Sequence, residues 1–206
     1  PRRLVPARKA TQIARFSDAV AAALPTPCHA TEVVDWCGGK GHLGRSLGAR
    51  LGLPVTVLER HAGYADEARA LADDDGVALR FVAADAMARP ITLQAQTIAV
   101  GLHACGELGL RLLEHAVDSV YMVALAPCCL HKIAGLHEHG YQPVSRAARA
   151  VDPGLDHSSL RLATAEEVVA RPSLQAQRRR DNAWRQGLDH LLRSAGRDGY
   201  TPLGVL

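Results

Sequence analysis

A glycine cluster in the first quarter of the chain has the composition and setting of a ligand-binding loop. The segment VVDWCGGKGHLG, residues 33–44, runs from an apolar stretch into Gly39 and Gly41 and then into an amphipathic stretch. Glycine permits positive φ and lets a ligand approach the backbone closely. The helix that would follow begins with free N–H groups, which favour polar or anionic ligand atoms. We therefore take this segment as a candidate cofactor loop.

Acidic residues follow the glycine cluster at the ends of two further apolar stretches. A carboxylate at Glu59 can accept hydrogen bonds from both hydroxyls of a ribose. Asp85 is placed for the amino group of an adenine, and Ala86 can offer its backbone N–H to the ring. An isolated aspartate after a strand is usually a turn former. The order Asp35, glycine loop, Glu59, Asp85 is more specific, and it predicts a nucleoside cofactor.

Two cofactors compete for this pattern. Gly39, Gly41 and Gly44 match the dinucleotide fingerprint GxGxxG, so an NAD(P)-dependent oxidoreductase is one interpretation. Asp35 disfavours it, because a pyrophosphate would meet the negative charge of this carboxylate. In an S-adenosylmethionine (SAM) site the same carboxylate faces the cationic amino-acid end of the cofactor, directly or through water. The pattern favours SAM, and a non-catalytic SAM-binding module stays open beside an enzyme.

The elements that must position these residues alternate along the chain. We predict five short strands, at residues 31–36, 55–59, 77–83, 97–103 and 120–126. Helices are predicted at 8–24, after the glycine loop, at 64–71 and between the last two strands. This alternation predicts an α/β fold, Rossmann-like and doubly wound, with a mainly parallel sheet and helices on both faces. Ligands of such folds bind at the carboxyl ends of the strands.

The C-terminal third is harder to interpret. Residues 141–144 are a candidate sixth strand, and residues 165–195 are predicted to be mostly helical, with an interruption or restart at Pro172. We expect a single domain over residues 1–206, with a leading helix and connector (1–30), a cofactor-binding core (31–134) and a C-terminal part (135–206). Because the chain starts with Pro1 rather than Met, we also expect a fragment of a longer protein.

Composition narrows the class of protein. Five cysteines, odd in number and two of them adjacent, do not form a disulfide framework and fit a reducing, cytoplasmic setting. No apolar run approaches the ~20 residues that a membrane span needs, so no membrane partner is expected. The formal net charge of +3 is mildly basic and does not by itself imply nucleic acid.

Three motifs resemble those of a known family. They are the segment Asp35–Leu43, GLHACGEL at 101–108 and APCCLHKI at 126–133. They are similar to the D-x-G-x-G-K-G-H-L, L-H-x-C-G and C-C-x-H motifs of methyltransferase-like proteins, a class I SAM-dependent family related to a tRNA 2′-O-methyltransferase family. The resemblance runs from about Arg8 to about Ile133, with Cys37 in place of the family's first loop glycine. It implies SAM as cofactor, bound by Asp35, Cys37, Gly39, Gly41, Glu59, Asp85, Ala86 and His103.

The resemblance also implies that a cluster of cysteines and histidines surrounds the reaction end of the cofactor. Its members are His103, Cys105, Cys128, Cys129 and His131, of which all but Cys105 are our catalytic candidates. A histidine can act as general base near neutral pH. These are also zinc-ligand residue types, but adjacent cysteines chelate poorly and a CxxC motif is missing, so we predict no metal. A third interpretation is that the cysteines pack as small hydrophobes.

The methyl acceptor is the least determined feature. The resemblance and the mild basicity favour RNA, either tRNA or rRNA, over a protein or a small molecule. The run Arg178–Arg180 near Trp184 could contact an RNA backbone. A solvated helix face is the more common explanation of such a run, and we favour it. The oligomeric state is not predicted.

Overall fold

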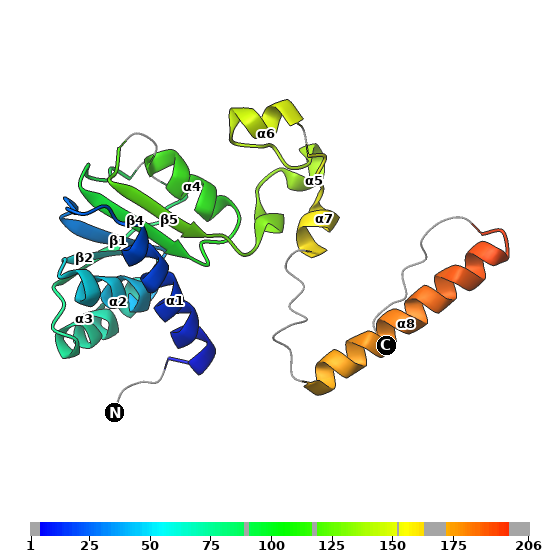
Figure 1. Cartoon of the computed structure of the whole chain (residues 1–206), viewed down its shortest axis with the longest axis horizontal. Helices are drawn as coiled ribbons and strands as arrows, with labels where there is room; N and C mark the ends of the chain where they lie inside the picture. Colours follow the sequence, from blue (N-terminus) through cyan, green and yellow to red (C-terminus); the bar gives the residue numbers. More distant parts are fainter. Residues whose placement is uncertain (1–4, 89–90, 117–118, 152, 163–171, 198–206) are drawn as a thin grey trace. The chain divides into compact units, whose positions relative to one another are not determined.

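The computed structural model describes residues 5–88, 91–116, 119–151, 153–162 and 172–197 (Figure 1). The chain forms two compact units that divide between residues 163 and 164. The first unit holds a sheet and the helices around it, and the second holds one long helix. The expected single domain and its three parts stay predictions.

Five parallel strands form the sheet of the first unit. They are β1 (Glu32–Trp36), β2 (Val55–Glu59), β3 (Leu79–Ala83), β4 (Thr97–Leu102) and β5 (Met122–Ala126). The strand order is β3-β2-β1-β4-β5, with Val33 of β1 opposite Val55 of β2 and Ile98 of β4. The chain therefore reverses its direction across the sheet between β1 and β4, which is where ligands bind in folds of this kind. All five strands confirm their predictions to within two residues.

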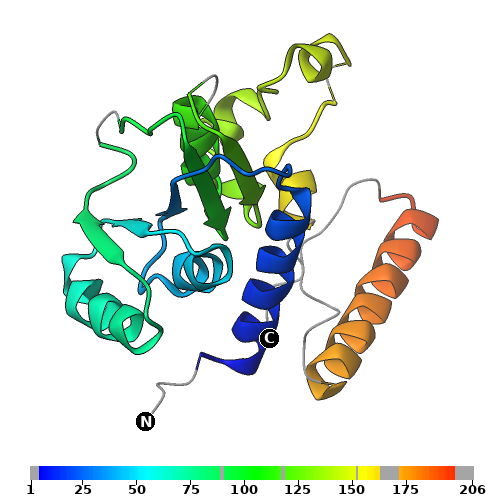
Figure 2. The same ribbon diagram turned by 60° about the vertical axis from the view of Figure 1, so that its left-hand side comes forward.

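Helices cover both faces of the sheet, which confirms the predicted Rossmann-like α/β fold. Figure 1 shows α1 (Ala7–Ala23), α2 (His42–Leu51) and α3 (Ala65–Asp74) on one face and α4 (Glu107–Ala116) on the other. In Figure 2, α1 in dark blue lies beside α2, and the two helices are in contact. Short 3₁₀ turns at Ala62–Tyr64 (η1) and Leu130–Lys132 (η2) follow β2 and β5.

Alternating side chains of the strands build two hydrophobic cores. Val33 of β1 joins Leu47 of α2 and Ile13 of α1 in the core on the first face. Val34, the next residue, packs with Leu112 of α4 in the core on the second face. Successive side chains of a strand point to opposite faces, so β1 serves both cores. The result is a sheet buried on both sides, whose strand ends are the places left for a ligand.

The remaining helices follow β5 in the chain. In the first unit these are α5 (Leu136–His139), α6 (Arg146–Val151) and α7 (His157–Leu162). The second unit contains α8 (Pro172–Ser194), which begins at the proline where a restart is predicted. Residues 165–171 of the predicted helical region lie outside the described residues. Within the described residues, no helix combines the length and the apolar character that crossing a lipid bilayer requires.

Two sequence predictions differ from the structure. Residues 141–144 form no strand: the N–H of Tyr141 donates to the carbonyl of Leu155 at 2.9 Å, and Pro143 has no N–H to give to a ladder. Helix α3 continues to Asp74, beyond the predicted end at Leu71. The sequence indicates a turn at this point because residues 73–76 are three aspartates and a glycine, which are turn-forming types, but the helix continues through the first two aspartates.

Candidate functional site

A cavity of about 200 Å³ lies at the carboxyl ends of β2 and β3, beside the loop that follows β1. It is lined by Cys37, Glu59, Arg60, Ala84, Asp85, Ala86, Met87 and Leu108. Four of these, Cys37, Glu59, Asp85 and Ala86, are predicted cofactor residues, and the fold brings them together from three strand ends. The sequence patterns missed the others, although Arg60 and Met87 directly follow predicted residues.

The glycine loop wraps around the carboxylate of Glu59. Gly39 has a φ of +58° and donates its backbone N–H to Glu59 Oε2 at 3.2 Å. Gly41 has a φ of +69° and forms the N-cap of α2. A Cβ added at Gly38 would lie 2.5 Å from Cγ of Asp35. The loop therefore needs glycine at Gly39 and Gly41 for conformation and at Gly38 for space.

Asp35 lies beneath this loop, with a side chain that is only 2% exposed. Its Oδ2 accepts the backbone N–H of Gly44 at 2.8 Å. Gly44 is the third residue of α2, and the first-turn N–H groups of a helix have no acceptor within the helix. The N-cap residue Gly41 has no side chain that could accept this N–H, so the carboxylate of Asp35, in β1, caps the helix instead. Asp35 does not line the cavity, and its predicted contact with the cofactor stays a prediction.

The electrostatics of this half of the site follow from burial. Burial raises the pKa of Asp35 to about 6, against the opposing effects of the Gly44 N–H and of Lys9. Burial also raises the pKa of the Cys37 thiol to about 12, helped by the charges of Glu59 and Asp35. The reactive form of a cysteine is its thiolate. Cys37 therefore stays a neutral thiol at neutral pH and serves as part of the cavity wall.

Glu59 and Asp85 have their carboxylates partly occupied by backbone donors. Besides the Gly39 bond, Glu59 Oε1 accepts the N–H of His61 at 2.9 Å. Asp85 Oδ1 accepts the N–H of Met87 at 2.9 Å, and the Asp85 side chain is exposed. A carboxylate has about four acceptor sites, so each keeps capacity for hydroxyl or amino donors of a ligand. The cavity can thus bind a polar ligand through two fixed carboxylates.

The loops after β4 and β5 carry the cysteines. The Sγ atoms of Cys105 and Cys128 lie 2.8 Å apart, and those of Cys128 and Cys129 lie 3.5 Å apart. All three are half-buried free thiols. Burial raises the pKa of Cys105, and burial together with the neighbouring thiols raises the pKa of Cys128. Three of the predicted reaction-end residues therefore form one cluster.

The two predicted histidines contact other partners. His103 has a φ of +66°, and its Nε2 lies 3.2 Å from Oε1 of Gln12 on α1. Because an amide oxygen only accepts, this Nε2 carries the hydrogen, which leaves Nδ1 as the acceptor of a neutral ring. The ring of His131 lies 5.8 Å from the ring of His157, and His131 Nδ1 is buried without a hydrogen-bond partner among the described residues.

The two cysteine-bearing loops touch through their backbones. Gly106 has a φ of +57°, and a Cβ on it would lie 2.6 Å from both the carbonyl carbon and the carbonyl oxygen of Lys132. No rotation of a side chain can relieve a contact with a backbone carbonyl. The glycine of the LHACG segment is thus required for the loop after β4 to lie against the 3₁₀ turn η2.

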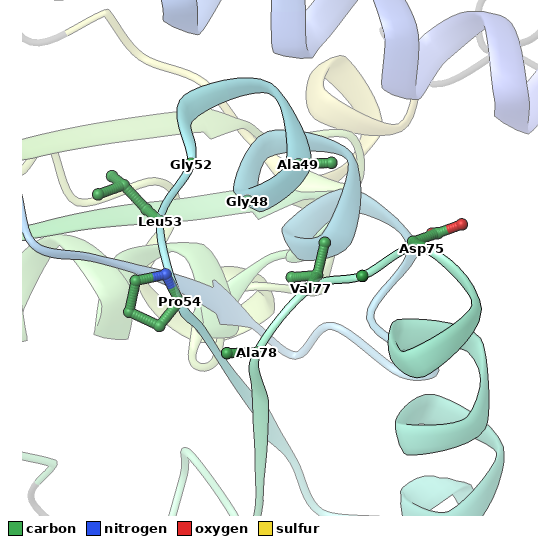
Figure 3. A pocket seen from close by; sticks show the side chains of 9 residues that line it. Gly48, Ala49, Gly52, Leu53, Pro54, Asp75, Val77 and Ala78 are labelled. Atoms are coloured by element: carbon green, nitrogen blue, oxygen red, sulfur yellow. The ribbon is translucent and has the colours of Figure 1, made fainter.

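A second hollow, of about 360 Å³, lies at the opposite edge of the sheet (Figure 3). It is formed where α2 leads into β2 and α3 leads into β3, between residues such as Gly48, Pro54 and Val77. Its polar member, Asp75, forms an ion pair with Arg45. This hollow is at the amino ends of the strands, away from the glycine loop, so it is a poor candidate for the cofactor.

Comparison with known proteins identifies the domain. A family model described as a methyltransferase domain matches residues 8–136, and no curated protein sequence matches the chain.

Three solved structures show similar folds. The tRNA (uracil-54, C5)-methyltransferase of Pyrococcus abyssi, solved with S-adenosyl-L-homocysteine, is 19% identical over 57% of this chain and 28% of its own, with a TM-score of 0.43. The mitomycin 7-O-methyltransferase MmcR is 21% identical over 67% of this chain and 40% of its own, with a TM-score of 0.44. The S-adenosylmethionine-dependent methyltransferase SibL, in its apo form, is 24% identical over 77% of this chain and 53% of its own, with a TM-score of 0.44. The chain thus spans 28–53% of the lengths of these proteins.

Proposed function

The chain belongs to this methyltransferase domain family, and from that premise we propose that it transfers a methyl group from SAM to RNA, either tRNA or rRNA. The observation that carries the proposal is the cavity of about 200 Å³ in which Cys37, Glu59, Asp85 and Ala86 meet. Glu59, Asp85 and Ala86 were predicted from their chemistry and order in the sequence and Cys37 from the family resemblance, and all four line this cavity.

The residues present fit the adenosine part of SAM. Glu59 would accept the ribose hydroxyls through the lone pairs that Gly39 and His61 leave free. Asp85 at the rim would accept the adenine amino group, and the buried Ala86 would contact the ring. Asp35 would support the loop and bring negative charge to the cationic end of the cofactor.

Methyl transfer from SAM depends more on the positioning of the reacting groups than on a strong base. When bound, SAM would supply a methyl group on a positively charged sulfur. An acceptor oxygen or nitrogen would bond to the methyl carbon in line with the breaking carbon–sulfur bond, and S-adenosylhomocysteine would leave. Correct alignment of the reacting atoms accounts for much of such catalysis. His103 is our candidate to accept the acceptor's proton, because a neutral imidazole that donates its Nε2 hydrogen to Gln12 has Nδ1 as the proton acceptor. Burial and the neighbouring thiols raise the pKa of Cys128, which makes it a poorer base than His103, and its catalytic role stays a prediction.

RNA as acceptor is supported by the family resemblance of the three motifs and by the net charge of +3. Helix α8 also carries three consecutive exposed arginines, Arg178–Arg180, a residue type that can pair with phosphate oxygens, but we favour a solvated helix face as the explanation of this run.

The cofactor is tested by calorimetric titration of the chain with SAM, S-adenosylhomocysteine and NADH in parallel. We expect heat from the two adenosyl ligands and none from NADH. Binding of NADH alone would overturn the proposal in favour of an oxidoreductase, and silence from all three ligands would contradict an intact cofactor site.

The acceptor is tested with SAM labelled in the methyl group, offered together with total tRNA, rRNA or protein. We expect label in RNA that ribonuclease releases and excess S-adenosylhomocysteine prevents. Label in protein would contradict RNA as the acceptor. SAM binding without transfer to any of these substrates would support a non-catalytic binding module.

A further inference from the structure

Three thiols from two separate loops meet at the reaction edge of the sheet. Cys105 follows β4, whereas Cys128 and Cys129 follow β5. Their Sγ atoms all lie within 4.8 Å of one another, and two of the three pairs are 2.8 Å and 3.5 Å apart. Parallel pairing of β4 with β5 places the two loops side by side, so this cluster depends on the fold and is not visible as a CxxC spacing.

The size of the cluster suits one thiophilic cation. Zinc binds thiolate sulfur at about 2.3 Å, which places tetrahedral sulfur ligands about 3.8 Å apart. The 3.5 Å pair nearly meets this spacing, and the 2.8 Å pair would have to open by about 1 Å. We propose that Cys105, Cys128 and Cys129 bind a zinc ion that ties the loop after β4 to the loop after β5. This reverses the prediction made from spacing alone.

A disulfide explains the same cluster less well. Bond formation between Cys105 and Cys128 would join two sulfurs and leave Cys129, 3.5 Å from Cys128, without a role. A metal ion uses all three thiols and needs no oxidant.

The charge of a zinc-bound cluster would be small. Three thiolates with one Zn²⁺ carry a net charge of −1, and zinc binding would release the thiol protons to the solvent. Lys132, in the turn η2 that follows Cys129, lies close enough for its positive charge to act on Cys105 and would offset the remaining charge.

His131 is the candidate for the fourth ligand. It stands two residues after Cys129 in the 3₁₀ turn η2, and its Nδ1 is buried without a hydrogen-bond partner among the described residues. Neither of its ring nitrogens lies within 4.8 Å of all three sulfurs, so the ring would have to move closer when the ion binds. Structural zinc sites have four protein ligands, and Cys₃His is a common set. Four protein ligands would leave no open position, so the ion would hold the two loops together and would not itself act on a substrate.

The test measures zinc in the chain purified under reducing conditions, by elemental analysis and by competition with a chelating dye. We expect about one zinc ion per chain, and a loss of at least about 100-fold in zinc affinity for Cys105→Ser, Cys128→Ser and Cys129→Ser. Cys28→Ser is the matched control, because Cys28 is an exposed thiol outside the cluster, and its zinc content should not change.

Thiol protection provides a readout that needs no variant. With zinc bound, an alkylating reagent should modify the three clustered thiols several times more slowly than after a chelator has removed the metal, whereas its rate at the exposed Cys28 should not change. Zinc that remains after all three substitutions, or three clustered thiols alkylated as fast in saturating zinc as after the chelator, would overturn the proposal. A Cys105–Cys128 disulfide that excludes zinc from the purified chain would also overturn it.

The result does not depend on the proposed function. Zinc content and alkylation are measured without cofactor or acceptor, and SAM binding is measured by its own titration. A chain that binds zinc but not SAM would retain this inference and contradict the methyltransferase proposal. A chain that binds SAM but not zinc would contradict this inference and leave the methyltransferase proposal standing.

Discussion

The two halves of the sheet's carboxyl edge use different chemistry. The half at β1, β2 and β3 consists of carboxylates fixed by backbone N–H groups, as Glu59 is by Gly39 and His61. The half at β4 and β5 consists of thiols and imidazoles in two loops that meet at Gly106. The first half suits a polar nucleoside, and the second suits a proton or a soft cation. The proposed cofactor cavity and the proposed reaction edge are therefore built from different side chains on different strands, and a substitution in one half can be made without touching the other.

The largest loss of stability should come from a substitution that separates the loop after β4 from the turn after β5. Gly106→Ala adds a Cβ 2.6 Å from the Lys132 carbonyl at a φ of +57°, and we expect it to lower the unfolding free energy by about 3 kcal/mol or more. Gly76→Ala is the matched control, because Gly76 has a φ of +66° but no atom within 4 Å of the added Cβ, and should lose only about 1 kcal/mol. Urea denaturation measures both, and equal losses would contradict the backbone contact.

The free energy of unfolding should depend on pH through the buried Asp35 of β1 and not through an exposed aspartate. The folded pKa of Asp35, about 6, is above its ordinary value of 3.8, so the folded state loses stability from this group as pH rises through that interval. Asp35→Asn cannot ionise and should be more stable than the parent by up to about 3 kcal/mol at pH 8, with the difference gone below pH 4. The exposed Asp66→Asn is the control and should show no such gain. A gain that does not vary with pH would contradict ionisation as its cause.

The next largest effect should be a loss of SAM affinity when Glu59, our proposed ribose ligand, is replaced. Glu59→Ala should weaken SAM by about 2 kcal/mol, roughly 30-fold, because two hydroxyls lose a charged acceptor. Glu114→Ala, on the exposed side of α4, should bind SAM normally. Thermal melting must accompany the titration, since Glu59 also accepts two backbone N–H groups. Unchanged affinity in a folded Glu59→Ala variant would exclude Glu59 as the ribose ligand.

The smallest effect concerns the cysteine in the glycine loop. Cys37 has a φ of +55°, which glycine adopts without strain, but its side chain packs against the core that contains α4. Cys37→Gly should therefore be more stable than Cys37→Ala by about 1 kcal/mol, because both lose the packing and only glycine relieves the strain. We expect SAM affinity of the glycine variant to be unchanged or improved. A clear loss of affinity would mean that the loop is misinterpreted.

The sequence predicted the β1–β3 half of the edge better than the β4–β5 half. Glu59 and Asp85 could be found because Glu59 ends one recognisable strand and Asp85 follows another by two residues, and parallel strands bring such residues to one edge. The burial of Asp35 could not be found in this way, because it depends on how closely Gly38 and Gly44 approach it in three dimensions.

The thiol cluster shows a different limit of the sequence. The resemblance placed Cys105 and Cys128 near each other, but their 2.8 Å separation depends on strand pairing and on the backbone contact at Gly106. The sixth strand failed for a simpler reason, since residues 141–144 have strand-like composition but Pro143 interrupts the donors that a ladder needs.

The buried carboxylate under the glycine loop has a consequence for calorimetry. At pH 6, roughly half of the molecules carry a proton on Asp35, since this is the pKa of the group. A cationic ligand that settles against this side chain would expel that proton into the buffer. The heat of titration at pH 6 should then vary with the ionisation enthalpy of the buffer, whereas at pH 8 it should not.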